Sequence, residues 1–171
     1  MAAILTLDEA KAALRFEDTD PERDDLLLDF VNGITDVVEQ QVGFVAQRSI
    51  ELEIRQYGTE VVLAGRNFLD IVSGVDVATG SPIDVTGMYI DWAGILRTTT
   101  NTVLPSLPWR LTVNVGLNPV PDAIKRGAAE VLIEAWATQR GSIAGGEARA
   151  FLIPYRAQAW LEPYTMADGF A

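Results

Sequence analysis

The fold is decided by residues 20–43, which read DPERDDLLLDFVNGITDVVEQQVG. Asp20 is a good helix cap, and Pro21 fits the first helical position because an N–H there would lack an intrahelical partner. The apolar residues that follow recur at spacings of three and four and share one helix face: Leu27, Val31, Ile34, Val38 and Val42. Gly43 suits the left-handed conformation in which helices often end. The stretch therefore predicts a helix of roughly 30 Å with one buried face.

A shorter helix is predicted just before this stretch. Thr6 and Glu9 form the pattern of a capping box, in which each side chain accepts a hydrogen bond from the other residue's backbone N–H. This helix is expected to run to about Arg15, and residues 16–19 connect it to the long helix.

After Gly43 the apolar residues change to alternation with polar ones, which is the period of a half-buried strand. Three segments carry this pattern most clearly, at residues 50–54, 88–92 and 109–115. Glycine-containing turns separate the strand-like segments. Residues 47–116 therefore predict an antiparallel β module, and the alternation places Trp92 and Trp109 on its core-facing side.

The chain then returns to helix. Residues 117–141 hold a proline-containing approach, a second apolar helical stripe and a terminating glycine. Residues 142–171 begin with a glycine-containing hinge and continue as an aromatic, proline-punctuated segment, for which we predict an extended arm. The predicted fold class is α+β in one domain. It comprises a small helical bundle (1–46 and 117–141), an inserted antiparallel β module (47–116) and an extended C-terminal arm (142–171).

The composition argues against an enzyme. The 171 residues include neither histidine nor cysteine, which removes the commonest general base, the commonest transition-metal ligand and every thiolate. No serine lies in a Gly-x-Ser-x-Gly motif. The aspartates of the β module lack the spacing of a calcium loop: Asp70, Asp76, Asp84 and Asp91. We therefore expect no catalytic residue, no metal site and no cofactor.

The formal net charge is −11 and is concentrated near the N-terminus. Residues 1–46 hold eleven Asp or Glu against three Lys or Arg, a net −8, and residues 47–171 hold thirteen against ten, a net −3. Such a chain has no basic cluster with which to grip DNA, whereas an acidic surface suits the wall of a conduit. No apolar run approaches the roughly 20 residues that span a bilayer, so no membrane association is expected.

Four segments in this order resemble the head–tail connector (adaptor) family of long-tailed bacteriophages. They are LTLDEAKAALR (5–15), the helix end VVEQQVG (37–43), the passage from VNVG (113–116) to VPDAIK (120–125), and IPYR (153–156). The resemblance implies a structural virion protein that forms a ring, usually of twelve copies, beneath the portal protein at the capsid vertex. It further implies a stopper or head-completion protein below the ring, DNA passing through without specific binding, and synthesis in the bacterial host cytoplasm.

Three sets of residues are candidates for these contacts. The resemblance assigns the aromatic arm to the portal, through Phe151, Tyr155, Arg156, Trp160 and Tyr164. The polar face of the long helix could line the channel, through Asp25, Asp29, Asp36 and Glu39. A polar loop could contact the next neck protein, through Thr99, Thr100, Asn101 and Thr102.

Each set also has a second interpretation. The aromatic arm could fold back on its own domain, and the threonine-rich loop could be an ordinary hairpin loop. The acidic helix face could be a solvated surface. It could also pack on a neighbouring subunit, where its carboxylates would need basic partners such as Arg66, Arg110 or Arg126.

Three alternative functions stay open at the level of sequence. The first is another neck component, a stopper or tail-terminator ring, which would favour a fold dominated by a β-barrel. The second is a carboxylate-dependent hydrolase that uses Asp91 and Glu53. The third is a peptide- or carbohydrate-binding module with an aromatic platform of Tyr89, Trp92 and Trp109, which the core-facing alternation of the two tryptophans weakens.

Overall fold

The computed structural model describes residues 3–16, 21–105, 108–140 and 153–165. The chain divides into two compact units. The helical unit consists of Met1–Ala46 and Pro119–Ala171, and the β unit is Gln47–Asn118.

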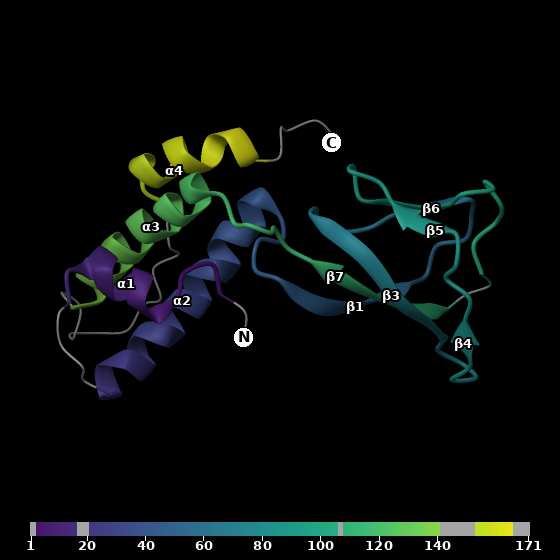
Figure 1. Ribbon diagram of the computed structural model, residues 1–171, viewed down its shortest axis with the longest axis horizontal. Helices are drawn as coiled ribbons and strands as arrows, with labels where there is room; N and C mark the ends of the chain where they lie inside the picture. The colour runs from purple at the N-terminus through teal and green to yellow at the C-terminus, as the bar shows by residue number, and fades with distance from the viewer. Residues whose placement is uncertain (1–2, 17–20, 106–107, 141–152, 166–171) are drawn as a thin grey trace. The chain divides into compact units, whose positions relative to one another are not determined.

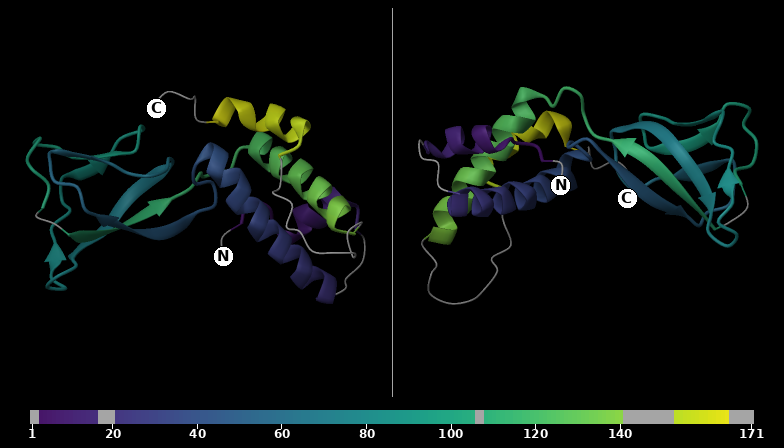
Figure 2. Two further views of the ribbon diagram at one scale, coloured as in Figure 1. Left: turned by 180° about the vertical axis from the view of Figure 1, so that it is seen from behind. Right: turned by 60° about the horizontal axis from the view of Figure 1, so that its bottom comes forward.

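The helical unit contains α1 (Leu7–Leu14), α2 (Pro21–Val42), α3 (Asp122–Arg140), α4 (Tyr155–Leu161) and the short 3₁₀ helix η1 (Glu162–Tyr164). Helix α3 packs against α1, α2 and α4 (Figure 1). In Figure 2 as well, α4 stays beside α3. The helical unit is therefore organised around α3.

The core of the helical unit is formed by the stripes that the sequence predicts on α2 and α3, together with two residues of α4 that were not predicted. The five α2 residues Leu27, Val31, Ile34, Val38 and Val42 are all buried. The matching residues of α3 and α4 are also buried: Ile124, Ala128, Val131, Leu132, Ala135, Ala157 and Leu161. Burial of apolar side chains of this size is the main stabilising contribution to such a bundle.

The predicted capping box is present at the start of α1. The Glu9 amide donates to the Thr6 hydroxyl at 3.2 Å, and the Thr6 amide donates to the Glu9 carboxylate at 2.8 Å. The same carboxylate receives the Lys125 ammonium of α3 at 2.7 Å. Burial by itself would raise the pKa of Glu9, but the contacts with Lys125 and Thr6 outweigh it and hold this pKa below its ordinary value.

The β unit contains two antiparallel sheets. The four-stranded sheet has the order β1 (Arg48–Ile54), β7 (Trp109–Val115), β3 (Phe68–Asp76) and β4 (Pro82–Ile83). The three-stranded sheet has the order β2 (Glu60–Val62), β6 (Ile95–Thr98) and β5 (Met88–Ile90). Strands β3 and β5, from different sheets, pack against each other.

The β unit has its own core, to which β7 contributes most. Trp109, Leu111, Val113 and Val115 are all 0% exposed, while the residues between them face outward. This alternation arises because successive side chains of a strand point to opposite faces of the sheet. Strand β1 pairs with β7 over its full length, from Arg48 opposite Val115 to Ile54 opposite Trp109.

The predicted α+β class is confirmed, and so are the two N-terminal helices and the third helix, which follows the β unit. The long helix spans Pro21–Val42 and is followed by Gly43 at φ 82°, as predicted. Its predicted cap, Asp20, lies outside the described residues. Among the described residues, no helix is both long and apolar enough to cross a membrane.

The ion pair between Glu9 and Lys125 gives a testable pH dependence. Because the pKa of Glu9 is lowered in the folded state, its carboxylate stabilises the fold above its unfolded pKa, which is about 4.3, and this contribution is lost as the pH falls through the folded pKa. Glu9→Gln, which can still cap α1, should be less stable than the wild type at pH 7 by about 0.5 kcal/mol.

Urea denaturation at several pH values tests this expectation. The difference between wild type and Glu9→Gln should shrink below pH ~4, where the carboxylate is protonated. In Lys125→Met the free energy of unfolding should lose the same pH-dependent contribution, since Lys125 is the cationic partner of Glu9. A difference that is equally large at pH 3 would contradict the ion-pair explanation.

Candidate interaction surfaces

The two carboxylates of the hydrolase hypothesis are each engaged locally. The Asp91 carboxylate accepts hydrogen bonds from the backbone N–H groups of Ala93 at 2.9 Å and Ile95 at 3.0 Å. These bonds close the turn between β5 and β6. Glu53, on the other sheet, accepts a hydrogen bond from Arg55 at 2.9 Å, which lowers the pKa of Glu53. A general acid needs a raised pKa, which the arrangement at Glu53 does not provide, and the two carboxylates lie on different sheets with local partners of their own.

No group of three His, Cys, Asp or Glu residues within the described ranges could hold a metal ion.

The aromatic platform of the third alternative does not form. Trp109 is completely buried in the core of the β unit, as predicted. Trp92 was expected beside it but is 92% exposed, so that prediction is wrong. The reason is that β5 ends at Ile90 and Asp91 starts the turn that carries Trp92, so the alternation stops before this residue. Trp92 is instead a single exposed aromatic on a hydrogen-bonded hairpin turn.

The threonine-rich loop follows β6 and is exposed, as the neck-contact hypothesis requires. The Thr98 hydroxyl accepts a hydrogen bond from the Thr102 backbone N–H at 2.8 Å, and the Thr99 backbone N–H donates one to the Gly87 carbonyl at 2.7 Å. Asn101 takes a left-handed conformation at φ 53°. The loop is thus held by its own hydrogen bonds, and Thr99, Thr100, Asn101 and Thr102 are displayed at its surface.

The described part of the C-terminal arm is helical, so the prediction of an extended arm is wrong for Tyr155–Leu161. Ala157 and Leu161 of α4 are 0% exposed and pack against α3. The packing requires Gly127 of α3, because a Cβ at this position would lie 2.8 Å from Cγ and Cδ2 of Leu161. This glycine therefore allows the close approach of the two helices. Of the predicted portal anchors, Phe151 lies outside the described residues.

The outer face of α4 combines aromatic and basic side chains. Tyr155 is 84% exposed, Trp160 is 39% exposed, and Arg156 lies at the surface. The guanidinium carbon of Arg126, from α3, lies 5.1 Å from the centre of the Trp160 ring. This surface, hereafter the α4 face, consists of Tyr155, Arg156, Trp160 and Arg126. Tyr164 follows it in η1 and is half-buried.

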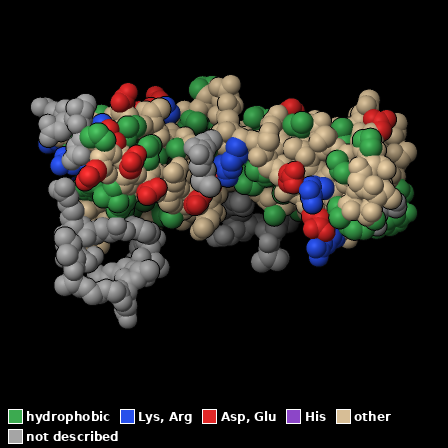
Figure 3. All heavy atoms as spheres, turned by 90° about the horizontal axis from the view of Figure 1, so that it is seen from below, with side chains coloured by type: hydrophobic (Ala, Val, Ile, Leu, Met, Phe, Trp, Pro, Cys, Tyr) green, Lys and Arg blue, Asp and Glu red, His purple; other side chains and the backbone are tan. Residues whose placement is uncertain are grey.

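The acidic surface of α2 is smaller than predicted. Asp25, Asp29 and Asp36 are exposed, but Glu39 is only 9% exposed. The Glu39 carboxylate accepts the backbone N–H groups of Val45 at 2.8 Å and Ala46 at 2.9 Å. Glu39 therefore holds the chain where it leaves the helix, and its assignment to a channel wall is wrong. Figure 3 shows acidic and apolar side chains mixed on one face of the helical unit.

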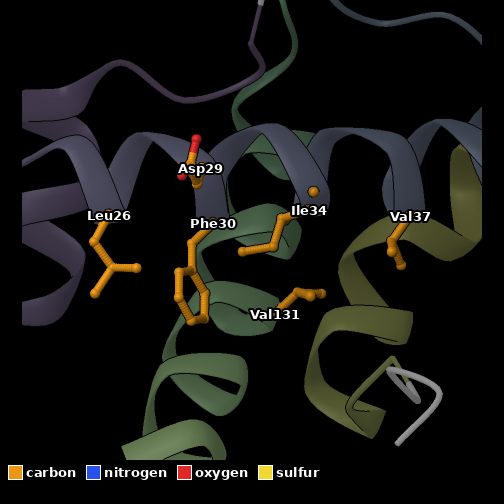
Figure 4. A pocket seen from close by; sticks show the side chains of 7 residues that line it. Leu26, Asp29, Phe30, Ile34, Val37 and Val131 are labelled. Carbon is orange, nitrogen blue, oxygen red and sulfur yellow. The ribbon is translucent and has the colours of Figure 1, made fainter. Parts of the chain in front are cut away.

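An apolar groove lies beside these carboxylates. It has a volume of about 240 Å³ and is lined by Leu26, Asp29, Phe30, Gly33, Ile34, Val37 and Val131. Figure 4 shows Leu26, Phe30 and Val37 projecting from α2 on the side where Val131 of α3 lies. The rings of Phe30 and Trp136 contact each other edge to face, with their centres 5.0 Å apart. This aromatic contact holds the Phe30 side chain that lines the groove.

This groove was not predicted from the sequence. Besides the stripe that fills the core, the long helix carries small or apolar residues on a second face at spacings of four, three and four: Leu26, Phe30, Gly33 and Val37. Leu26 is 51% exposed. A second apolar face on a helix whose first face fills the core is a signal that the sequence does contain.

No protein-family profile matches the sequence, and no curated protein matches it. Solved structures do share its fold. A chain in the neck of an empty GTA particle, computed with C6 symmetry, superposes with a TM-score of 0.71 and 14% identity, over 98% of this chain and 92% of that chain. A chain in the neck of a native GTA particle, computed with C12 symmetry, superposes with a TM-score of 0.63 and 15% identity, over 99% and 97%. The chain thus has the fold of a protein found in particle necks.

The burial of Glu39 predicts a stability effect that a channel-lining residue would not have. Glu39→Ala should lower the free energy of unfolding by about 2–4 kcal/mol, because it leaves two buried N–H groups without their acceptor. Asp36→Ala, on the exposed part of the same helix, should change it by less than about 0.5 kcal/mol. Urea denaturation of both variants measures the contrast, and equal effects would contradict the assigned role.

The docking of α4 predicts a local effect of Leu161→Ala. Removing this fully buried side chain should destabilise the contact of α4 with α3 by about 2–4 kcal/mol. Hydrogen exchange should then become faster in α4 while the central amides of α3 keep their protection. Ala159→Ser, at an exposed position of α4, serves as the control. Unchanged exchange in Leu161→Ala would show that α4 does not depend on this packing.

Proposed function

We propose that this protein is a structural, non-enzymatic subunit of the neck of a tailed, phage-like particle, and specifically its head-to-tail adaptor. One observation carries the proposal, namely the likeness of fold to chains in the necks of gene transfer agent (GTA) particles, which extends over nearly the whole of both chains. Because coverage is high in both directions, the helical unit and the β unit both have counterparts in those neck proteins.

The surfaces of the chain support a role in assembly. They include the groove on α2, the α4 face, the exposed Trp92 and the hydrogen-bonded threonine loop. Exposed aromatic and apolar groups on rigid elements are typical of protein–protein contacts.

The proposed assembly is a ring, with twelve copies as the sequence resemblance implies. The neck structures of similar fold were computed with C6 and C12 symmetry, which supports a subunit repeated around an axis. The net charge of −11 per chain makes the ring strongly acidic, and such a wall would repel the DNA backbone. DNA would then pass without specific binding.

In the particle, the ring would sit at the capsid vertex, between the portal protein above and a stopper or head-completion protein below. The threonine loop at residues 99–102 and Trp92 are proposed for the contact with the next neck protein. The portal contact is assigned to the ring as a whole. The residues predicted for a portal-binding arm lie, within the described part of the chain, mainly in α4, which is docked on α3.

A stopper or tail-terminator ring is the nearest rival function. That alternative favours a fold dominated by a β-barrel with peripheral helices. In this chain the helices form a compact unit with its own core, and the sheets form a separate unit. The architecture therefore favours the adaptor.

Electron microscopy of the purified protein mixed with portal rings from the same particle tests the proposal. We expect a second ring stacked on the portal, with twelve-fold symmetry, and no such ring on empty tails. Binding to empty tails but not to portal rings would contradict the adaptor function. Portal rings incubated without the protein are the control.

A further inference from the structure

We infer that the groove on α2 of one copy receives the α4 face of the next copy, so that the two surfaces form a head-to-tail interface. The inference deepens the proposed function, since it names the contact that would build the ring. It rests on three features of the helical unit: an unexplained glycine, two surfaces of complementary composition, and the packing of α3 against both of the helices that carry these surfaces.

The glycine is Gly33, in the middle of α2. A glycine inside a helix costs about 1 kcal/mol relative to alanine, so it normally serves a close approach or an unusual backbone conformation. Within the described chain, Gly33 serves neither a close approach nor an unusual backbone conformation. Its backbone is helical, and a Cβ added there would meet nothing within 4 Å. Gly127 offers the contrast, because its missing side chain makes room for Leu161.

Gly33 lines the apolar groove, and this location supplies a reason for it. A side chain at this position would project into the space between Leu26, Phe30 and Val37. Because no described residue of the chain fills this space, we take the missing side chain as room for a partner that enters the groove. An aromatic side chain is a suitable occupant, because aromatic groups contribute large contact areas at low entropic cost.

The charges beside the groove identify the occupant. Asp25, Asp29 and Asp36 are exposed on α2, and no ion pair involves them among the described residues. The α4 face has the complementary composition, with exposed Tyr155 and Trp160 beside Arg126 and Arg156. Neither arginine has an ion-pair partner in the described part of the chain. The groove is lined by Asp29, and its helix also exposes Asp25 and Asp36, so its composition matches an aromatic surface that carries arginines.

The two surfaces lie on one unit and contact α3 separately, since α3 packs against α2 and also against α4. A contact between different surfaces of identical chains is heterologous, and repetition of such a contact gives a closed ring or an open filament. A second copy of this chain is therefore an occupant that fits both the chemistry of the groove and a ring assembly.

Filling the groove should block assembly without harming the fold. Gly33→Leu adds a good helix former where there is free space, so the thermal stability of the monomer should stay the same or rise. The dissociation constant for self-association should increase by roughly 30-fold or more, the effect of losing an interface hot spot. Ala12→Leu, which adds the same side chain at an exposed position of α1, should leave assembly unchanged.

A mixing experiment distinguishes the head-to-tail contact from a symmetric one. Gly33→Leu keeps an intact α4 face, and Tyr155→Asp/Arg156→Asp keeps an intact groove. Each variant alone should be monomeric in sedimentation velocity, whereas the 1:1 mixture should form a dimer and nothing larger. Failure of the mixture to form a dimer where wild type assembles, or rings of Gly33→Leu like those of wild type, would overturn the inference.

Engineered disulfides extend the test to weak contacts and to rings on the portal. The chain has no cysteine, so Gly33→Cys/Tyr155→Cys can form bonds only through the introduced residues. Oxidation should give a ladder of linked copies, and Ala12→Cys/Tyr155→Cys should not. A ladder without portal attachment would contradict the adaptor function alone, and portal rings without a ladder would contradict this interface alone. If neither formed, both proposals would fail.

Discussion

The helical unit depends on the packing of α2 against α3, two helices that the whole β unit separates in the sequence. Their contact stripes are almost fully buried, with Leu27, Val38, Ile124 and Leu132 at 0% exposure. Closing so long a segment carries an entropic cost. The pairing of β1 with β7 reduces this cost, because Arg48 and Val115 lie opposite each other where the chain enters and leaves the β unit.

Two glycines in helices show how the same residue serves different partners. Gly127 makes room for Leu161, a contact within the chain that explains the position of α4. Gly33 makes room for nothing in the described chain, yet it occurs where α2 and Val131 form an apolar groove. The helical framework thus contains one glycine whose space is filled within the subunit and one whose space no described residue fills.

The parts of the fold that could be predicted from sequence depend on local signals. The capping box of α1, the Pro21 start of α2 and the alternation in β7 all act over a few residues. The predictions that were wrong concern residues whose positions are set by tertiary contacts. Helix α4 has only seven residues, too few for stability without its docking on α3. Glu39 lies on the polar side of the α2 pattern, but its long side chain reaches the backbone of Val45 and Ala46 after the chain turns.

The candidate surfaces were predictable to a similar extent. The exposure of Asp25, Asp29 and Asp36 follows from helical periodicity, whereas the groove needs Val131 of α3 to complete it. No pattern within one helix specifies which residue of another helix will lie beside it. Trp92 is exposed for a related reason, since the Asp91 turn ends the strand period one residue earlier. Finally, because β1 and β7 are direct neighbours, the chain enters and leaves the inserted β unit at adjacent positions. Such an insertion can lengthen, shorten or be exchanged during evolution while the helices retain their sequence, so the contacts of the β unit can diversify independently of those of the helical unit.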